Sequence, residues 1–335
     1  MAAELPTFTP AGAEAYAGFA KFSGGYRASI QAMLELGIKP ALRCLPQGES
    51  VKILEVGAGQ GKSAWAIDTA LRSQDNLPDI RIFRTEPDEK KTIAEGRAAF
   101  FSGSDTELLL PEVVAPAEVL PVAGEFVRLV VGSQVLHWMN GEQARRSFRE
   151  AHRVLKDGGT LVHATSGIMN LLSYNEHHFT RHPFVLYQYL PLLEAALTRR
   201  GYWDRAKDGV FVPWNPQANP VYYRYTLADV RQWLQDAGFH HINIRMSMFP
   251  CDTKEIEARL STNFAALEMH FFQSERLKAI PKEEKMEMAK TAFEAAKAQA
   301  PDLFASFDRQ NREVTIGSVF ARTSGEPVPV IVARK

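Results

Sequence analysis

Short apolar runs alternate with helix-like segments along much of the chain. Val51 to Val56 reads as a buried strand, Ser63 to Leu71 as the helix that follows it, and Ile80 to Glu86 as a second short strand. Towards the other end, His241 to Phe249 and Val328 to Lys335 read as two further strands. Strands that alternate with helices favour an α/β fold with a largely parallel sheet.

The turn between the first strand and its helix is rich in glycine. Gly57, Gly59 and Gly61 occupy alternate positions and follow closely on Glu55. Glycine permits a positive φ and lets a ligand touch the backbone where a side chain would collide with it. A dinucleotide-binding loop has the spacing G-x-G-x-x-G, but here Lys62 stands where its third glycine would fall, and a phosphate-binding P-loop is absent. The turn therefore predicts a ligand loop of another kind.

This loop resembles motif I of the class I S-adenosylmethionine-dependent methyltransferases, in which an apolar strand and an acid precede G-x-G-x-G. Four later landmarks look like the same family, namely Glu86, Ala117-Glu118, Leu136-His137-Trp138 and Gly158-Gly159. In these core motifs the chain is similar to the small-molecule type, such as the trans-aconitate and biotin-precursor carboxyl methyltransferases. The resemblance implies a Rossmann-like, doubly wound sheet of seven strands, mostly parallel with the last strand antiparallel. It also implies S-adenosylmethionine as cofactor and S-adenosylhomocysteine as product.

The resemblance further implies where the cofactor lies. In an open parallel sheet the ligand crosses the carboxyl ends of neighbouring strands, so the Glu86 carboxylate can accept both ribose hydroxyls. A solvated strand-end acid is the alternative. Tyr26 is the candidate near the methionine end, although plain packing of an N-terminal helix explains its spacing equally well. By the same resemblance, Ala117 and Glu118 lie at the adenine edge of the cofactor. The expected cofactor residues are Tyr26, Glu55, Gly57, Ala58, Gly59, Gly61, Glu86, Pro87, Ala117, Glu118, Ser133, Gln134 and Trp138.

Three further features concern local structure. Gly158 and Gly159 are expected to close a helix, because glycines just past a helix end take the left-handed conformation. Thr226 and Asp229 form an N-terminal capping pattern for a later helix. Arg128 stands early in the fourth strand, where the family usually has Asp, and this departure affects local packing more than cofactor binding.

Composition favours a cytoplasmic enzyme with a sizeable core. The chain has 335 residues, of which 45% are hydrophobic, and its formal net charge is zero. No apolar run approaches the ~20 residues of a membrane helix, and Met1 to Pro10 has neither a basic start nor an apolar stretch. The chain has only two cysteines, Cys44 and Cys251, and this low number argues against a disulfide framework and a clustered thiolate metal site. Because no basic run is interleaved with aromatics, nucleic acid is a poor candidate partner.

Two stretches exceed the minimal core of the family and should decide what is methylated. The first, between the fifth strand and the capped helix, is strongly aromatic, which argues against disorder and favours a lid. The second, Asp252 to Gln310, is helical by pattern, and its aromatics are more often ordinary core than ligand contacts. The expected substrate-binding residues are His137, Trp138, Tyr174, Arg181, Tyr187, Trp214 and Tyr223.

The expected chemistry is displacement at the sulfonium methyl by a nucleophile held in line about 3 to 3.5 Å away. A general base is needed only if the acceptor must lose a proton, as a phenol or an amine does and a carboxylate does not. His137 and His178 are the candidates for that base, and orientation of its loop is the alternative role for His137. No metal is predicted, since adjacent histidines such as His177 and His178 seldom ligate one ion.

The predicted organisation is therefore a cofactor-binding core with added segments. The core comprises 50–168, 226–251 and 313–335, preceded by an N-terminal helical cap segment at 1–49. An aromatic lid at 169–225 and a helical cap at 252–312 are inserted into it. The predicted function is transfer of a methyl group to a small molecule, by O- or C-methylation of a carboxylate or an aromatic or prenyl metabolite. N- or O-methylation in secondary metabolism is left open. The alternative is a non-catalytic cofactor-binding regulatory or partner subunit. We expect neither nucleic acid nor a membrane as partner, and a homodimer is left open.

Overall fold

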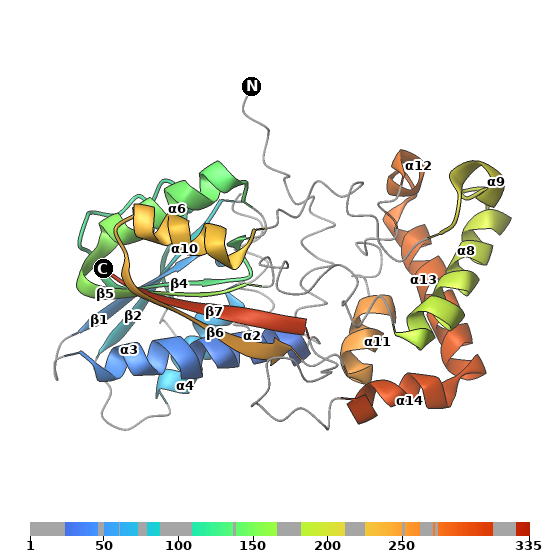
Figure 1. Ribbon diagram of the computed structural model, residues 1–335, viewed down its shortest axis with the longest axis horizontal. Helices are drawn as coiled ribbons and strands as arrows, with labels where there is room; N and C mark the ends of the chain where they lie inside the picture. Colours follow the sequence, from blue (N-terminus) through green and yellow to red (C-terminus); the bar gives the residue numbers. More distant parts are fainter. Residues whose placement is uncertain are drawn as a thin grey trace.

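The computed structural model describes two bodies, a sheet body and a helical body, which lie side by side (Figure 1). The described residues are 24–45, 50–59, 61–72, 79–87, 109–136, 139–165, 182–211, 225–249, 252–261, 271, 274–310 and 326–335. Helices of the sheet body cover both faces of one sheet, whereas the helical body contains no described strand (Figure 1).

The sheet has seven strands in the order β3-β2-β1-β4-β5-β7-β6. The strands β1 to β5 pair in parallel, and β7 runs antiparallel to both of its neighbours. This topology confirms the doubly wound, seven-stranded sheet with an antiparallel last strand. The strands are β1 Val51–Val56, β2 Ile80–Glu86, β3 Leu109–Val114, β4 Val127–Ser133, β5 Leu155–Ala164, β6 His240–Phe249 and β7 Glu326–Arg334.

The helices of the sheet body form two layers. One face of the sheet carries α2 (Gly24–Met33), the π-helical turn η1 (Leu34–Ile38), α3 (Lys39–Arg43) and α4 (Lys62–Arg72), while the other carries α6 (Gly141–Val154) and α10 (Leu227–Asp236). Side chains alternate between the faces along each strand. On β4, for example, Val131 packs in the core beneath α2 and α4, and Val130 packs in the core beneath α6 and α10.

Side-chain caps begin the two helices on the α6 face. Asn140 caps α6 through a capping box with Gln143. Thr226 and Asp229 form the equivalent box at α10, which confirms the prediction from their spacing. Each box satisfies backbone N–H groups that the first turn of a helix leaves without partners.

Gly158 and Gly159 do not close a helix, so that prediction is wrong. The α6 helix ends at Val154, and Leu155 is already extended (φ −71°, ψ 136°) as the first residue of β5. Gly158 lies inside β5 with φ +71°, where the register between β4 and β5 shifts. A Cβ at Gly159 would lie 2.7 Å from the Lys156 carbonyl oxygen. Both glycines therefore shape an irregular start of the strand.

The helical body unites residues from two separate inserts around one core. Phe184, Tyr189, Leu193 and Phe293 are all fully buried in it. Phe304 and Phe307 pack there as well, in agreement with their interpretation as ordinary core. Its elements are η5 Val185–Tyr189, α8 Leu190–Arg199, α9 Arg205–Asp208, α11 Thr253–Ser261, α12 Glu275–Lys278, α13 Lys282–Gln299 and α14 Pro301–Gln310.

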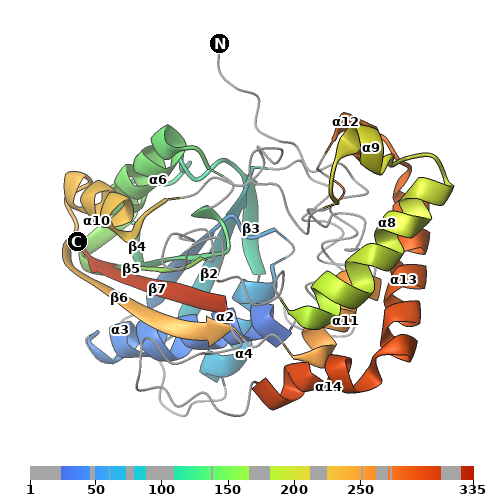
Figure 2. The ribbon, with the colours of Figure 1, turned by 45° about the vertical axis from the view of Figure 1, so that its right-hand side comes forward.

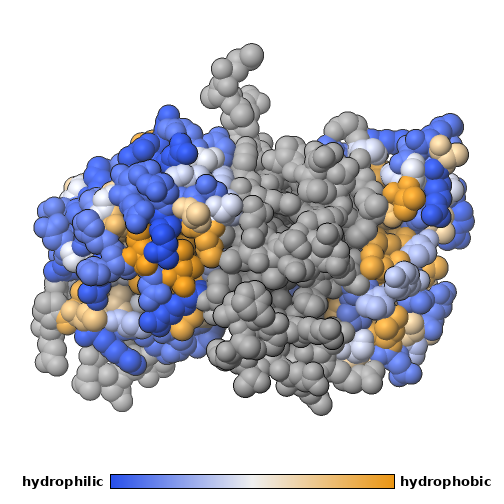
Figure 3. Space-filling model, in the orientation of Figure 1, coloured by the Kyte–Doolittle hydropathy of each residue, from blue (hydrophilic) through white to orange (hydrophobic). Residues whose placement is uncertain are grey.

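The helical body approaches the sheet body through α11, which lies against α2 (Figure 2). On the face shown in Figure 3, the outer parts of both bodies are mostly hydrophilic, and apolar residues gather mainly on the sides turned toward the other body. None of the described helices is long and apolar enough to span a membrane.

Candidate functional site

The glycine loop connects β1 to α4 at the carboxyl edge of the sheet. Gly57, Gly59 and Gly61 have φ of 62°, 51° and 75°, values that favour glycine over any residue with a side chain. A Cβ at Gly57 would lie only 2.6 Å from the Val135 side chain, so packing requires glycine there. A Cβ at Gly59 would meet nothing within 4 Å. The loop is thus packed at its start and open at its centre.

Glu86 holds the centre of this loop. It is the last residue of β2, and its Oε2 accepts a hydrogen bond of 2.7 Å from the Gly59 N–H. The Ala58 N–H donates to the Thr85 carbonyl oxygen at 3.0 Å, so two consecutive residues of β2 engage the loop. Pro87, the next residue, is exposed. The strand-end acid predicted from sequence therefore lies directly beside the predicted ligand loop.

Glu55, the acid before the loop, is buried beneath it and is only 1% exposed. It accepts hydrogen bonds from the Ser63 hydroxyl and the Ala64 N–H at the start of α4. Arg84 is its register partner on β2 and is itself 3% exposed. Burial raises the pKa of Glu55 to about 7, while Arg84 and the two hydrogen bonds limit the rise. Glu55 thus connects the strand before the loop to the helix after it.

Two of the predicted cofactor-binding residues, Ser133 and Gln134, lie at the end of β4. Ser133 is 5% exposed, and its hydroxyl has no hydrogen-bond partner among the described residues. Gln134 has a φ of 57°, which is strained for a residue with a side chain, and its Nε2 donates to Ser29 Oγ at 3.2 Å. Ser29 belongs to α2, one helical turn after Tyr26, whose side chain lies outside the described part of the chain. The α2 helix therefore lies beside the end of β4.

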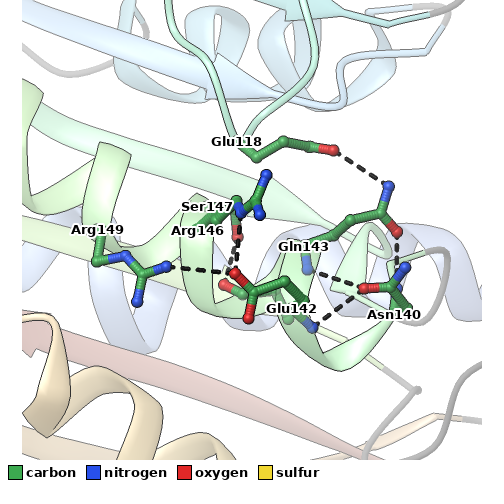
Figure 4. Close-up of polar contacts among 8 residues, drawn as sticks. Glu118, Asn140, Glu142, Gln143, Arg146, Ser147 and Arg149 are labelled. Atoms are coloured by element: carbon green, nitrogen blue, oxygen red, sulfur yellow. Dashed lines mark hydrogen bonds and ion pairs between the residues drawn. The ribbon is translucent and has the colours of Figure 1, made fainter. Parts of the chain in front are cut away.

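The turn after β3 is fastened to α6 along its length. Ala117 is 3% exposed, and Glu118 Oε1 accepts a hydrogen bond of 3.1 Å from Gln143 Nε2 (Figure 4). Further along, Glu150 Oε2 accepts from the Leu120 N–H at 2.8 Å. Glu118, expected at the adenine edge of the cofactor, is therefore oriented by the first turn of α6.

His163 is a buried histidine near the carboxyl end of β5. It lies opposite Gly132 of β4, where an added Cβ would be 2.8 Å from its Cδ2, so the ring occupies the space that the glycine leaves. The side chain is 4% exposed, and Nδ1 has no hydrogen-bond partner among the described residues. Burial lowers the pKa of His163 to about 4, so the ring is neutral at pH 7.

Most of the predicted catalytic and substrate-binding residues fall outside the part of the chain that the structure describes. His137, Trp138, Tyr174, His178, Arg181, Trp214 and Tyr223 lie outside the described residues. Tyr187 belongs to η5 of the helical body and is 70% exposed. Arg128, the departure from the family pattern, donates from Nη1 to the Asp157 carbonyl oxygen at 3.0 Å, which stabilises the irregular start of β5. The roles of all these residues at a ligand stay predictions.

The structure also brings in four residues that sequence reasoning did not select: Ser29, Arg84, Gln143 and His163. Only Gln143 carries a recognisable signal, because Asn140 followed three residues later by glutamine is a capping-box pattern. The other three lie inside a helix or a strand, where nothing in the local pattern sets them apart.

Residues 54–163 match the family model of the methyltransferase domain. Over these residues the chain is similar to a methyltransferase domain, and its sheet has the strand order and directions that the class I resemblance implies. The matched residues run from β1 to the end of β5 and include the glycine loop, Glu86, Glu118 and Gln134. The closer similarity to carboxyl methyltransferases of the trans-aconitate type stays a prediction. No curated protein matches the chain.

Solved structures with a similar fold are distant in sequence. A chain in the complex between the Trm112 methyltransferase activator and a methyltransferase of Haloferax volcanii is 15% identical, with coverage of 94% of this chain and 96% of that one and a TM-score of 0.41. The chain is 12% identical to Haemonchus contortus phosphoethanolamine N-methyltransferase 2, which was solved with phosphomonomethylethanolamine and S-adenosylhomocysteine. That match covers 98% of this chain and 57% of that one, with a TM-score of 0.49. The chain is 17% identical to an S-adenosylmethionine-dependent methyltransferase of Mesorhizobium loti, with coverage of 88% of this chain and 96% of that one and a TM-score of 0.38.

S-adenosylmethionine is the cofactor of this class of methyltransferase domain, and the described residues fit it. The domain offers an open glycine loop at Gly59, a carboxylate at Glu86 beside it, and a buried hydroxyl at Ser133 that has no partner within the described ranges. An unpaired buried polar atom is rare in native proteins and is readily explained by a bound ligand. Across the described parts of the chain, no group of three or more His, Cys, Asp and Glu side chains could hold a metal ion.

Proposed function

We propose that the chain transfers the methyl group of S-adenosylmethionine to a small-molecule acceptor, by O- or C-methylation of a carboxylate or of an aromatic or prenyl metabolite. The observation that carries the proposal is the loop from Gly57 to Gly61, which Glu86 holds open at the carboxyl ends of β1 and β2. A scaffold protein has no need for a carboxylate that fixes the centre of an open loop. A homodimer, a cytoplasmic location and a role in secondary metabolism stay predictions.

The topology supports a role of the helical body at the acceptor. The chain leaves the sheet after Ala164 of β5 and after Phe249 of β6, and it returns at Glu326 of β7. Phe249 pairs with Glu326, and Ala164 pairs with Ser133 at the end of β4. Both inserts therefore depart from the sheet edge at which the parallel strands end, the edge where ligands bind in open α/β sheets.

S-adenosylmethionine, when bound, supplies a sulfonium methyl group for in-line displacement. The chain contributes position: Glu86 and the glycine loop fix the ribose end, and the Gln134 backbone is held rigid by the bond from its N–H to the Ala164 carbonyl oxygen at 2.7 Å. Water exclusion by the helical body would strengthen the electrostatic interactions around the reacting groups. A carboxylate acceptor needs no base, whereas a phenol needs one, for which His137 and His178 are the predicted candidates.

Calorimetry with S-adenosylmethionine tests the cofactor part of the proposal. Glu86→Gln removes the charged group that would accept from the ribose hydroxyls. Because a hydrogen bond to a charged group stabilises by about 1.5–3 kcal/mol, binding should weaken about 10- to 100-fold. Asp79→Asn is the matched control, because Asp79 precedes the same strand at its opposite end and is exposed. Equal affinity of wild type and Glu86→Gln would remove Glu86 from the site, and absence of any binding by wild type would refute the proposal.

Incubation with methyl-labelled cofactor and a panel of acids, phenols and prenyl diphosphates then identifies the acceptor. Transfer to at least one class, lost in Glu86→Gln, is the expected result. Tight cofactor binding without transfer to any acceptor would favour the alternative, a non-catalytic subunit that binds the cofactor.

A further inference from the structure

Gln143 connects two parts of the site that are far apart along the chain. Its Oε1 accepts a hydrogen bond of 2.9 Å from the Asn140 N–H, and its Nε2 donates to Glu118 Oε1 at 3.1 Å (Figure 4). Asn140 Oδ1 in turn accepts from the Glu142 and Gln143 N–H groups at 3.1 and 2.9 Å. One amide group thus belongs to the cap of α6 and to the turn after β3 at once.

The orientation of this amide is determined by its partners. A backbone N–H can only donate, so the atom next to Asn140 must be the amide oxygen, and a carboxylate accepts, so the atom next to Glu118 must be the amide nitrogen. A reversed amide would place donor against donor and acceptor against acceptor. Gln143 therefore fixes the direction in which the Glu118 carboxylate lies.

The rest of the turn is fixed independently, so Glu118 is the group whose direction depends on Gln143. Arg153 donates from Nη2 to the Leu120 carbonyl oxygen and from Nη1 to the Val122 carbonyl oxygen, both at 2.9 Å. Glu150 holds the Leu120 N–H. With these contacts in place, loss of the Gln143 bond should leave the backbone of the turn where it is and release only the Glu118 side chain.

We propose that Gln143 is a positioning residue for the adenine end of the cofactor, because it holds the Glu118 carboxylate, the group that would accept from the exocyclic amino group of adenine. The proposal rests on the proposed function and on the predicted place of Glu118 at the adenine edge. A carboxylate accepts hydrogen bonds and therefore favours a purine with an amino group at that position over one with a carbonyl group. Through Asn140, Gln143 also ties this carboxylate to the N-terminus of α6.

Gln143→Glu separates this role from the capping role. Glutamate is a usual residue at the third position of a capping box and can still accept from the Asn140 N–H, so α6 should keep its cap. Toward Glu118, however, it presents a second carboxylate in place of a donor, and the two charges repel. We expect affinity for S-adenosylhomocysteine to fall about 10-fold, while affinity for the analogue with hypoxanthine in place of adenine stays within about 2-fold of wild type.

The exchange Gln143→Glu with Glu118→Gln reverses the direction of the bond and should restore affinity for S-adenosylhomocysteine to within about 3-fold of wild type, since one amide again donates to one carboxylate. Glu142→Gln is the matched control, because Glu142 lies in the same helical turn but pairs with Arg146 at 2.9 Å on the exposed side. Its affinities should equal those of wild type. Calorimetry measures all affinities, and thermal unfolding checks that every variant is folded.

Wild-type affinity of Gln143→Glu for S-adenosylhomocysteine would overturn the proposal. An equal loss for both analogues, or a loss that the exchanged pair does not rescue, would overturn it too, because the effect would then not concern the adenine amino group. Absence of binding by wild type itself would instead refute the proposed function, so the two failures are distinguishable.

Discussion

Two buried groups near the carboxyl edge of the sheet should change the stability of the protein with pH in opposite directions. His163 has a folded pKa of about 4 against an ordinary value of 6.5, and burial is the cause. Between these values the unfolded chain binds a proton that the folded protein excludes. The stability that neutral His163 contributes is therefore complete above about pH 6.5 and is lost as the pH falls to about 4. This difference in pKa corresponds to about 3 kcal/mol of unfolding free energy.

Glu55 acts in the reverse sense over nearly the same range. Burial raises its pKa from 4.5 to about 7, so the folded protein binds a proton that the unfolded chain releases. The contribution of protonated Glu55 is complete below about pH 4.5 and is lost as the pH rises to about 7, again about 3 kcal/mol. Arg84 and Glu86 are the charged groups that act on Glu55, and their effects are smaller than that of burial. The two contributions should nearly cancel in the wild type.

Single variants should expose each contribution. Between pH 6.5 and pH 5, His163→Phe should gain about 2 kcal/mol of unfolding free energy relative to wild type, because the unfolded variant no longer takes up that proton. Glu55→Gln should lose about 2 kcal/mol over the same interval, and the double variant should run parallel to wild type. Urea unfolding at pH 5.0, 5.5, 6.0 and 6.5 measures these differences.

An exposed histidine supplies the control. The control is His240→Gln, the substitution of an exposed histidine on β6. Parallel curves for His163→Phe and wild type would show that His163 is not a neutral, enclosed ring. A rise in place of a fall for Glu55→Gln would refute the reasoning on Glu55.

Three further predictions concern the loop, the helical body and a cap. Gly57→Ala should lower the free energy of unfolding by about 2–5 kcal/mol, because the added Cβ is strained at positive φ and collides with Val135. Gly59→Ala meets open space and should lower it by only about 1–2 kcal/mol; urea unfolding measures both. Leu193→Ala should destabilise the helical body by about 2–5 kcal/mol with little change in S-adenosylhomocysteine affinity, which unfolding and calorimetry would show. Thr226→Ala should cost about 1 kcal/mol through loss of the α10 cap, seen as a lower melting temperature.

Much of the sheet could be predicted from local pattern. The ranges Val51–Val56 and Ile80–Glu86 are strands as expected, because each is a short, buried or half-buried apolar run with a clear turn signal at its end. The start of β5 could not be predicted in this way. A Gly-Gly pair after a helix usually marks the helix end, but Leu155 turns directly into the strand and pairs with Val127, which moves the glycines inside β5.

The helical body shows the limit for packing between distant segments. The apolar faces of α8 and α11 each follow a helical period in the local sequence. That period does not reveal that Leu193 of the first insert and Phe293 of the second share one core, because β6 and α10 separate them along the chain. A single structural body made from two inserts therefore becomes visible only in the fold.

The same limit explains which part of the candidate site could be predicted. The residues that should touch the cofactor stand in a contiguous motif, as Gly57 to Gly61 do, because backbone conformation imposes the glycines locally. The residues that orient them are joined by polar contacts across long separations, 25 positions between Glu118 and Gln143 and 105 between Ser29 and Gln134. Such a contact needs only one compatible donor and acceptor, which many side chains supply, so it leaves no pattern in a single sequence. The positioning of the site, and with it any selectivity for adenine, must accordingly be determined from the three-dimensional structure.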